Sequence, residues 1–192
     1  MSEHLSGPEA KIIAFVGLTG SGKSKAVEYV TEKGVPKVYF GGVILDAMRE
    51  EGIELNEANE RAFREELRQR EGNDVVVNRI VKQIQDLIAA GQRRIVADGI
   101  YTWTEYKVMK HAFPGELTVV AVVTPKHLRY QRLAKREVRP LSASEATTRD
   151  WAEIENLEKG GPIAIADYYV HNDRDVAWLD EQIDTVLEHI EF

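Results

Sequence analysis

Residues 17–24 read Gly-Leu-Thr-Gly-Ser-Gly-Lys-Ser and constrain the fold of this 192-residue chain more than any other segment. They match the pattern G-x-x-x-x-G-K-[ST] at every fixed position. The three glycines allow the backbone to curl, so that successive N–H groups point inward at the oxygen atoms of a phosphate group. An apolar run at 11–16 precedes the segment and a helical pattern follows it, so a helix N-terminus adds partial positive charge. The segment therefore predicts a P-loop rather than a flexible glycine turn before an ordinary helix.

Two side chains of this loop have specific expected roles in binding a nucleoside triphosphate. Lys23 is expected to place its ammonium between the β- and γ-phosphates, and the Ser24 hydroxyl is expected to ligate Mg²⁺. The other nucleotide-binding candidates in the loop are Gly17, Thr19, Gly20, Ser21 and Gly22. We therefore expect Mg²⁺ and ATP, as phosphate donor, to be the cofactors, although the loop does not distinguish ATP from GTP.

Short apolar runs that alternate with helical patterns predict an α/β fold, with a parallel sheet covered on both faces. Strands are expected at 11–16, 38–40, 94–98, 117–123 and 168–170, the second closed by Gly41-Gly42. Helices are expected at 24–33, at 43–71 with a break near Gly52, across 77–88 after an N-cap at Asn73, at 125–136, at 142–159 and at 176–190. Ser142 and Glu145 form a capping-box pair, and Gly160-Gly161-Pro162 is expected to end the helix that they start.

Asp98 is the acidic residue expected to act beside the loop. It ends the strand expected at 94–98 and is followed by Gly99. Ligands of open parallel sheets bind at the carboxyl ends of strands. Asp98 is therefore a candidate catalytic residue and Mg²⁺ ligand, which would hold the metal's water or the acceptor hydroxyl. The alternative is a turn aspartate before glycine, a common pairing.

The overall charge makes nucleic acid and membranes unexpected partners. The formal net charge is −7, from 25 basic and 32 acidic residues, so cations that bind a polyanionic nucleotide must be concentrated locally. Residues 126–139 contain six Lys or Arg and one acid. Among them Arg129, Arg132 and Arg136 are spaced to share one helix face, and guanidinium groups suit phosphate oxygens. A solvated helix face or a weak nucleic-acid patch is the alternative.

The absence of cysteine excludes a disulfide framework, a thiolate zinc site and a cysteine nucleophile. It suits a reducing cytoplasm, which is the expected location. Residues 1–10 are polar, lack the apolar region of a signal peptide and are expected to form a flexible tail. No apolar run approaches the ~18 residues of a membrane span. The length of 1–192 fits a single domain, and the oligomeric state is left open.

Four segments, in order along the chain, resemble the nucleotide kinase branch of P-loop proteins, meaning adenylate kinase, dephospho-CoA kinase and their relatives. They are GLTGSGKS at 17–24, IVADG at 95–99, RLAKR at 132–136, and Ala166-Asp167 followed by Asn172. RLAKR looks like the start of the lid in those kinases, and the last segment looks like dephospho-CoA kinase. The resemblance implies a P-loop three-layer α/β/α sandwich, with a five-stranded parallel sheet and a helical lid at about 132–150.

The resemblance also implies which residues meet the two substrates. Arg132 and Arg136, with Arg149 as a further candidate, would close over the triphosphate and act in catalysis. A helical segment at about 42–72 would bind the acceptor, with Arg49, Arg64 or Arg68 as candidates for contacting its phosphate. Glu105, on the helix after Asp98, is a candidate to orient one of these arginines, and a solvated face is the alternative.

The expected function is transfer of the γ-phosphate of ATP to a small nucleotide-like acceptor, either a nucleoside monophosphate or a dephospho-CoA-like molecule. This chain has Leu45 where adenylate kinases carry an arginine, and Ile100-Tyr101 where they continue with proline and arginine. The acceptor therefore stays open. The alternatives are a non-catalytic nucleotide-binding module, which the missing arginine favours, and a regulatory GTPase or ATPase. The N-K-x-D and D-x-x-G patterns of GTPases are not evident in the chain.

Overall fold

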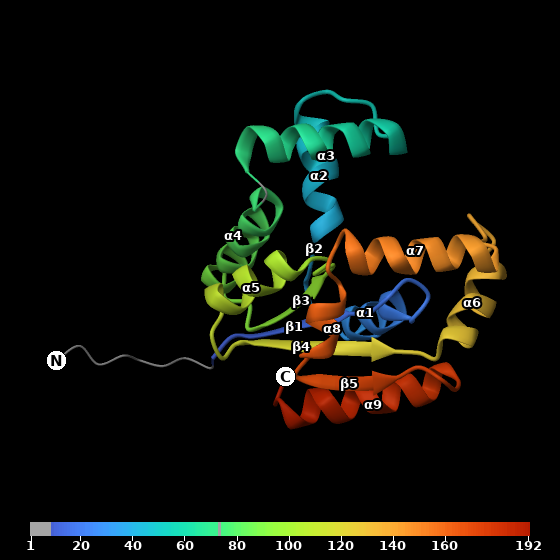
Figure 1. Ribbon diagram of the computed structural model, residues 1–192. Helices are drawn as coiled ribbons and strands as arrows, with labels where there is room; N and C mark the ends of the chain where they lie inside the picture. Colours follow the sequence, from blue (N-terminus) through green and yellow to red (C-terminus); the bar gives the residue numbers. More distant parts are fainter. Residues whose placement is uncertain (1–8, 73) are drawn as a thin grey trace.

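A computed structural model describes residues 9–72 and 74–192, except the side chains at 57, 58, 61 and 64. Most of the expected flexible tail, 1–8, and the expected N-cap Asn73 lie outside the described residues. The elements (Figure 1) are β1 (Lys11–Val16), α1 (Lys23–Glu32), β2 (Lys37–Tyr39), α2 (Phe40–Glu50), α3 (Glu57–Glu71), α4 (Val75–Ala89), β3 (Arg94–Asp98), α5 (Trp103–Ala112), β4 (Leu117–Val123), α6 (Lys126–Ala134), α7 (Ala143–Glu155), α8 (Gly160–Ala164), β5 (Tyr168–His171) and α9 (Val176–His189).

The five strands form one parallel sheet in the order β2-β3-β1-β4-β5. The central strand β1 pairs with β3 and β4, and Phe15 is in register with both Asp98 and Val120. Because all strands run in the same direction, their carboxyl ends meet at one edge of the sheet. The expected five-stranded parallel sheet is confirmed, and this edge carries the P-loop, Asp98 and the end of β5.

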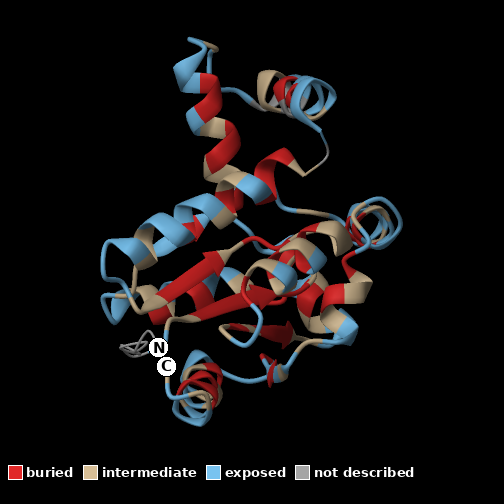
Figure 2. Ribbon diagram, turned by 90° about the vertical axis from the view of Figure 1, so that its left-hand side faces the viewer, coloured by how far each residue is buried: buried red, intermediate tan, exposed pale blue. Residues whose placement is uncertain are grey.

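Alternate residues of β1 face opposite sides of the sheet, and both sides are buried. Ile12 and Ala14 pack in a core with residues of α2, α4 and α5, whereas Ile13 and Phe15 pack with α1 and α9. In Figure 2 the strands are largely red, and the helices turn their pale blue exposed surfaces away from the sheet. The three-layer α/β/α arrangement is therefore confirmed, with a separate apolar core on each face.

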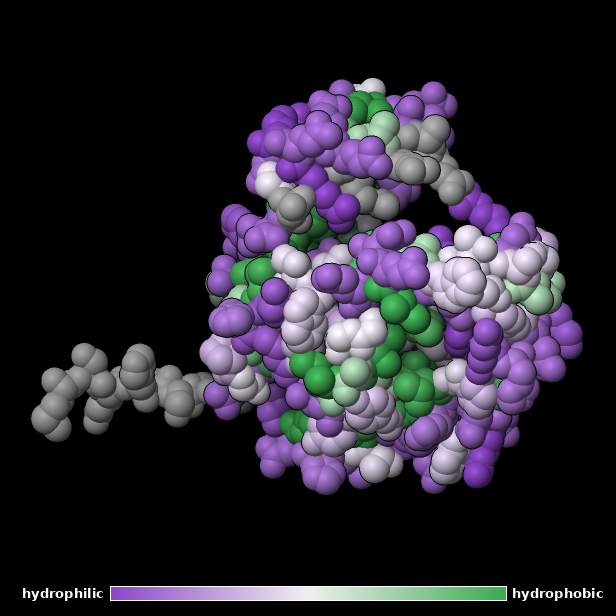
Figure 3. All heavy atoms as spheres, in the orientation of Figure 1, coloured by the Kyte–Doolittle hydropathy of each residue, from purple (hydrophilic) through white to green (hydrophobic). Residues whose placement is uncertain are grey.

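Helices α2 and α3 project from the sheet at the end of β2 (Figure 1). Phe63 and Leu67 of α3 are buried in the same core as Met48 of α2, while the outer surface of this arm is mostly hydrophilic (Figure 3). The expected break near Gly52 is confirmed, since α2 ends at Glu50 and the Asn56 side chain caps α3 by accepting from Asn59 N.

The prediction that Gly41-Gly42 closes the second strand is wrong. Strand β2 ends at Tyr39, and α2 starts at Phe40 and runs through both glycines. A Cβ on Gly41 would lie 2.5 Å from the tip of the Tyr39 ring. A Gly-Gly pair is typical of a turn, but here the two glycines make room for the Tyr39 side chain against the first turn of the helix.

Two helices end earlier than expected. Helix α6 stops at Ala134 rather than at 136, and the chain then folds back so that Leu141 N donates to Leu133 O. Helix α7 has the expected Ser142 capping box but stops at Glu155. Residues 160–162, expected only to end that helix, begin the short α8.

Candidate active site

The loop between β1 and α1 has the backbone shape that its glycines predict. Gly20 and Gly22 have φ angles of 85° and 97°, in the left-handed region that favours glycine. A Cβ on Gly22 would lie 1.9 Å from Nδ2 of Asn172, so a larger residue does not fit. That amide donates to Ser21 O at 2.8 Å, and the end of β5 thereby braces the loop.

A cavity of about 570 Å³, here called the donor cavity, lies against this loop. Its lining consists of every residue of 17–25, together with Tyr101, Arg132, Arg136, Arg149, Glu153 and Lys159. Four of the six side chains from outside residues 17–25 are cationic, and Lys23 and Lys25 add two more cations. The fold therefore concentrates positive charge at one site of an acidic chain, as binding of a polyphosphate requires.

Lys23, which lines the donor cavity, forms an ion pair with Asp98, which is not among the lining residues. Lys23 Nζ lies 2.8 Å from Asp98 Oδ1, and Lys37 Nζ lies 3.9 Å from Asp98 Oδ2. Both side chains of the Lys23–Asp98 pair are largely buried, with exposed fractions of 15% and 13%. The carboxylate that sequence reasoning selected therefore lies beside the P-loop lysine, at the end of the strand next to β1.

Ser24 and Asp98 offer a donor set that fits Mg²⁺. One hydroxyl and one carboxylate are hard oxygen ligands, and Mg²⁺ commonly takes one or two protein ligands plus phosphate oxygens and water. Within the described residues, no cluster of three or more His, Asp or Glu side chains could hold a metal ion. A set of two protein ligands suits a metal that arrives with a triphosphate.

Arg132 and Arg136 both line the donor cavity. Arg132 Nη2 donates to Asn172 Oδ1 at 3.3 Å, while its Nη1 is buried without a hydrogen-bond partner in the described part of the chain. A buried guanidinium donor without a partner is costly, and an anionic ligand would satisfy it. Arg136 lies beyond the end of α6 and is exposed.

Arg129 does not share this cavity face with Arg132 and Arg136, contrary to the spacing argument. Its guanidinium makes a bidentate pair with Asp150, at 2.7 Å for each bond, and also donates to Thr19 O at 3.0 Å. Arg129 is 5% exposed. It ties α6 to α7 and to the P-loop, because the inner side of α6 packs against α7.

Glu153 is a functional candidate that sequence reasoning missed. It is 1% exposed, accepts from Thr19 N at 3.0 Å and accepts from the Thr19 hydroxyl. Arg149 Nε at 3.1 Å and Lys159 Nζ at 2.9 Å complete its contacts. Burial by itself raises the pKa of Glu153, but Lys159 and the Thr19 donors outweigh it, so the pKa lies below its ordinary value. The spacing of Arg149 and Glu153 on one helix was the available signal, but it does not indicate contact with Thr19.

The expected lid, at about 132–150, contains a continuous exposed stretch at 134–140. The helices on either side of this stretch contact the P-loop through Arg129 and Glu153. Closure of the lid over a ligand stays a prediction, and these contacts limit the freely exposed part to the connection between α6 and α7.

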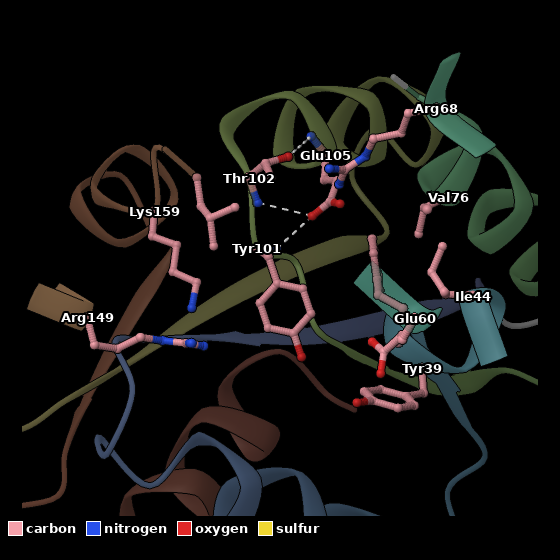
Figure 4. Close-up of a pocket in the computed structure, with 13 residues that line it drawn as sticks. Tyr39, Ile44, Glu60, Arg68, Val76, Tyr101, Thr102, Glu105, Arg149 and Lys159 are labelled. Carbon is pink, nitrogen blue, oxygen red and sulfur yellow. Dashed lines mark hydrogen bonds between the residues drawn. The ribbon is translucent and has the colours of Figure 1, made fainter. Parts of the chain in front are cut away.

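A second cavity, of about 280 Å³, lies beside the first and is here called the acceptor cavity (Figure 4). The residues that line it are Tyr39, Phe40, Gly41, Ile44, Glu60, Arg68, Val76, Tyr101, Thr102, Glu105, Arg149, Leu157 and Lys159. It thus combines aromatic and apolar walls with three cationic and two acidic side chains, a net positive set that suits a small molecule with an apolar part and a negative charge.

Of the acceptor candidates, Arg68 and Glu105 line this cavity and Arg49 does not. Arg49 is exposed and pairs with Asp46 at 2.5 Å, because this part of α2 turns it toward solvent. The side chain of Arg64 lies outside the described residues. The cavity is therefore lined by part of the segment expected to bind the acceptor, whose role stays a prediction, and the sequence could not tell which of its arginines faces inward.

Glu105 is only 7% exposed, so the alternative that it lies on a solvated helix face is wrong. Its Oε2 accepts from Tyr101 N and Thr102 N, and the Thr102 hydroxyl accepts from Glu105 N in a capping box (Figure 4). Burial raises the pKa of Glu105, and Arg68 is among the groups that oppose the rise. Glu105 therefore shapes the first turn of α5 and adds negative charge near Arg68.

Tyr101, Arg149 and Lys159 line both cavities. Lys23 Nζ lies 5.2 Å and Lys159 Nζ 5.1 Å from the centroid of the Tyr101 ring. Burial raises the pKa of Tyr101, so its hydroxyl stays protonated at neutral pH. The two cavities therefore meet at a tyrosine ring accompanied by cations.

The sheet order, the loop after β1 and the carboxylate at the end of β3 define a member of the P-loop nucleotide kinase superfamily. The family model described as an AAA domain (AAA_18) matches residues 13–152, and the chain belongs to this family. Similar proteins are named "UPF0200 protein". That of Thermococcus onnurineus is 34% identical, over 93% of this chain and 97% of its own, and that of Thermococcus gammatolerans is 32% identical, over 93% and 95%.

Solved structures share the fold at low sequence identity. TT1252 from Thermus thermophilus has a TM-score of 0.64 and 18% identity, covering 94% of this chain and 98% of its own. A gluconokinase from Sinorhizobium meliloti 1021 has a TM-score of 0.57 and 17% identity, covering 96% and 97%. A shikimate kinase from Bacteroides thetaiotaomicron has a TM-score of 0.56 and 14% identity, covering 95% and 99%.

Within residues 9–72 and 74–192, no helix combines the length and apolar character needed to cross a membrane.

Proposed function

We propose that this protein transfers the γ-phosphate of ATP to a small nucleotide-like acceptor, a nucleoside monophosphate or a dephospho-CoA-like molecule. The observation that carries the proposal is that the donor and acceptor cavities adjoin, with Tyr101, Arg149 and Lys159 lining both. Direct transfer requires donor and acceptor oxygens in line on either side of one phosphorus atom. Two adjoining cavities on the P-loop edge of the sheet would allow that arrangement.

On the donor side, the loop amides and Lys23 would hold the β- and γ-phosphates. Arg132, whose Nη1 is buried without a partner in the described residues, would donate to a phosphate oxygen, and Arg136 would join it from the exposed stretch after α6. Mg²⁺, held by Ser24 and Asp98, would neutralise phosphate charge as the transfer proceeds. Asp98 would in addition orient the acceptor oxygen, so its charge affects turnover more than binding.

On the acceptor side, Arg68 would contact an acceptor phosphate, and Tyr39 and Tyr101 offer ring faces for an apolar or aromatic part. The solved structures named as gluconokinase and shikimate kinase favour a small-molecule acceptor over a protein. The cavity is compact, at about 280 Å³, which also favours an acceptor of small-molecule size. A cytoplasmic location stays a prediction.

The alternatives are a non-catalytic nucleotide-binding module and a regulatory NTPase. Both would use the donor cavity alone, and neither explains a second cavity with inward-facing cations beside it. A module that only binds would retain ATP without forming any product, and a regulatory NTPase would hydrolyse nucleotide at a rate unaffected by every acceptor.

The deciding experiment is incubation with γ-labelled ATP and Mg²⁺ against nucleoside monophosphates, deoxynucleosides, dephospho-CoA, shikimate and gluconate. We expect labelled product with at least one phosphate-bearing nucleotide acceptor. Product from a neutral small molecule or a sugar acid, with all nucleotide acceptors inert, would overturn the acceptor class. ATP binding without product from any acceptor, including water, would favour the non-catalytic module.

A further inference from the structure

Lys159 reaches the boundary of the two cavities because the chain turns sharply after α7. Glu158 has a φ of 52°, and Lys159 N donates to Glu153 O at 3.1 Å. The lysine side chain then points back to Glu153 of α7, and it is only 9% exposed. In Figure 4 its amine points toward the cavity, on the same side as the guanidinium of Arg149. The position of the Lys159 ammonium is therefore fixed by the backbone hydrogen bond to Glu153 O and by the ion pair with the Glu153 side chain.

The Lys159 ammonium lies beside the carboxylate of Glu153 and the ring of Tyr101. Nζ lies 2.9 Å from Glu153 Oε1 and 5.1 Å from the centroid of the Tyr101 ring. An ammonium has three N–H donors, and the ion pair with Glu153 uses one of them. Burial lowers the pKa of Lys159, while Glu153 raises it and Arg149 and Lys23 lower it further. Glu153 therefore maintains a positive charge in a place where burial opposes it.

A structural role alone explains this lysine poorly. Burying an ion pair often contributes less stability than apolar side chains of similar volume would, because both charges lose their water. Arg149 and the two Thr19 donors already contact the Glu153 carboxylate. The ion pair lies where the donor and acceptor cavities meet, which is where negative charge would develop during transfer.

We propose that Lys159 is a further catalytic residue, whose ammonium contacts an oxygen of the phosphoryl group as it passes between the two cavities, and that Glu153 is its positioning residue. This inference rests on the proposed function. An acceptor oxygen forms the new bond to phosphorus, and the bond to the β,γ-bridging oxygen breaks, leaving its electron pair on the nucleoside diphosphate. A phosphate-oxygen acceptor has no proton to lose, and a hydroxyl acceptor gives its proton to solvent. Lys159 stays protonated throughout and stabilises charge on the equatorial oxygens.

The test compares Lys159→Met with the control Lys82→Met. Lys82 also pairs with a carboxylate, Asp86 at 2.7 Å, but lies exposed on α4. For each variant, affinity is measured for ADP alone and for ADP with aluminium fluoride, which mimics the transferring phosphoryl group. We expect Lys159→Met to weaken binding of the mimic by ~10²-fold or more. Its ADP affinity and all affinities of the control should change less than about threefold.

A second pair of variants separates catalysis from folding. The double variant Glu153→Gln/Lys159→Met removes both buried charges together. It should therefore fold even if the single variant Lys159→Met does not. It should show the same selective loss of the mimic, and Lys159→Arg should recover part of it. Loss of ADP affinity in parallel with the mimic would mean that Lys159 supports only the shape of the loop, and would overturn the inference.

The outcomes distinguish this inference from the proposed function. Wild-type protein that binds the mimic more tightly than ADP, yet transfers phosphate to no acceptor, would refute the proposed function, and selective loss in Lys159→Met would still support the role of Lys159. Equal affinity of wild type and Lys159→Met for the mimic would overturn that role, whatever the acceptor panel gives. A wild type whose ADP affinity does not change with aluminium fluoride would overturn the role of Lys159, and the acceptor panel would still decide the proposed function.

Discussion

Lys23 Nζ lies 2.8 Å from Asp98 Oδ1, so the P-loop lysine at the start of α1 and the carboxylate at the end of β3 form an ion pair. Phe15, in register with Asp98, places the two strand ends side by side. A triphosphate that binds here must share the Lys23 ammonium with Asp98, and a metal ion offers Asp98 a replacement partner. The pair thus links nucleotide binding to the carboxylate that the proposed mechanism uses.

Lys23→Ala removes the cation expected between the β- and γ-phosphates. We expect triphosphate affinity to fall by roughly 10-fold or more, because charge-assisted hydrogen bonds contribute roughly 1.5–3 kcal/mol each. Titration with a fluorescent ATP analogue measures this, and circular dichroism checks that the fold persists. Wild-type affinity together with wild-type turnover would contradict the assigned role of the loop.

Asp98→Asn preserves size while removing the charge that faces Lys23 and the proposed metal. We expect turnover to fall by roughly 10²–10⁴-fold, and nucleotide affinity to change much less. The measurement is the rate at saturating ATP, acceptor and Mg²⁺, with affinity determined separately. A rate equal to that of the wild type at saturation would return Asp98 to a turn-residue role.

Arg132→Met and Arg136→Met test the cations from the expected lid. If each acts on the transferring group, turnover should fall by ~10³-fold or more. Arg132 should be the more sensitive, since its Nη1 is already buried without a partner in the described residues. Arg79→Met is the control, because Arg79 pairs with Glu71 on the exposed surface. Near-normal turnover in both lid variants, with equal hydrogen exchange of 134–140 with and without an ATP analogue, would mean that this stretch is not a lid.

Arg68→Met should act on the acceptor and not on ATP. We expect the KM for the acceptor to rise by roughly 10–100-fold, while the KM for ATP changes little, because the lost bond joins a guanidinium to an anionic acceptor. Arg70→Met is the matched control on the same helix, where Arg70 pairs with Glu51 at 2.6 Å outside the acceptor cavity. The same acceptor KM in both variants would place the acceptor elsewhere.

Glu153→Gln should shift the pH profile of turnover. Lys159 must be protonated to act, so activity is present below its pKa and lost as pH rises through it. Burial lowers that pKa and Glu153 raises it, while Arg149, Lys23 and the neighbouring Tyr101 complete its surroundings. Without the Glu153 carboxylate the pKa of Lys159 falls further, and the alkaline limb should move to lower pH.

The measurement for this prediction is the pH dependence of turnover at saturating substrates, for wild type and Glu153→Gln. Glu71→Gln is the control, since Glu71 pairs with Arg79 on the surface, and its alkaline limb should coincide with that of wild type. An alkaline limb that moves to higher pH, or does not move, in Glu153→Gln would contradict the role assigned to the Glu153–Lys159 pair.

Local signals were enough to predict the strands and the P-loop. The apolar runs of β1, β3 and β4 appear directly in the chain, because strands buried on both faces need continuous apolar sequence. The loop could be predicted because its glycines encode its own curvature, as Gly20 and Gly22 show. Asp98 followed from its place at a strand end. Each of these inferences needs only neighbours in sequence.

Tertiary packing decided how the remaining charged residues are used. Arg129 and Arg132 are three residues apart, yet one pairs with Asp150 and the other lines the donor cavity, because α6 packs its inner side against α7. Glu153 contacts Thr19 across 134 residues of sequence, and Lys159 reaches both cavities only because the chain turns at Glu158. Helical spacing places side chains on a face, but it carries no information about what packs against that face. The contacts of buried charges depend on that packing, since each must find a partner wherever the fold brings one.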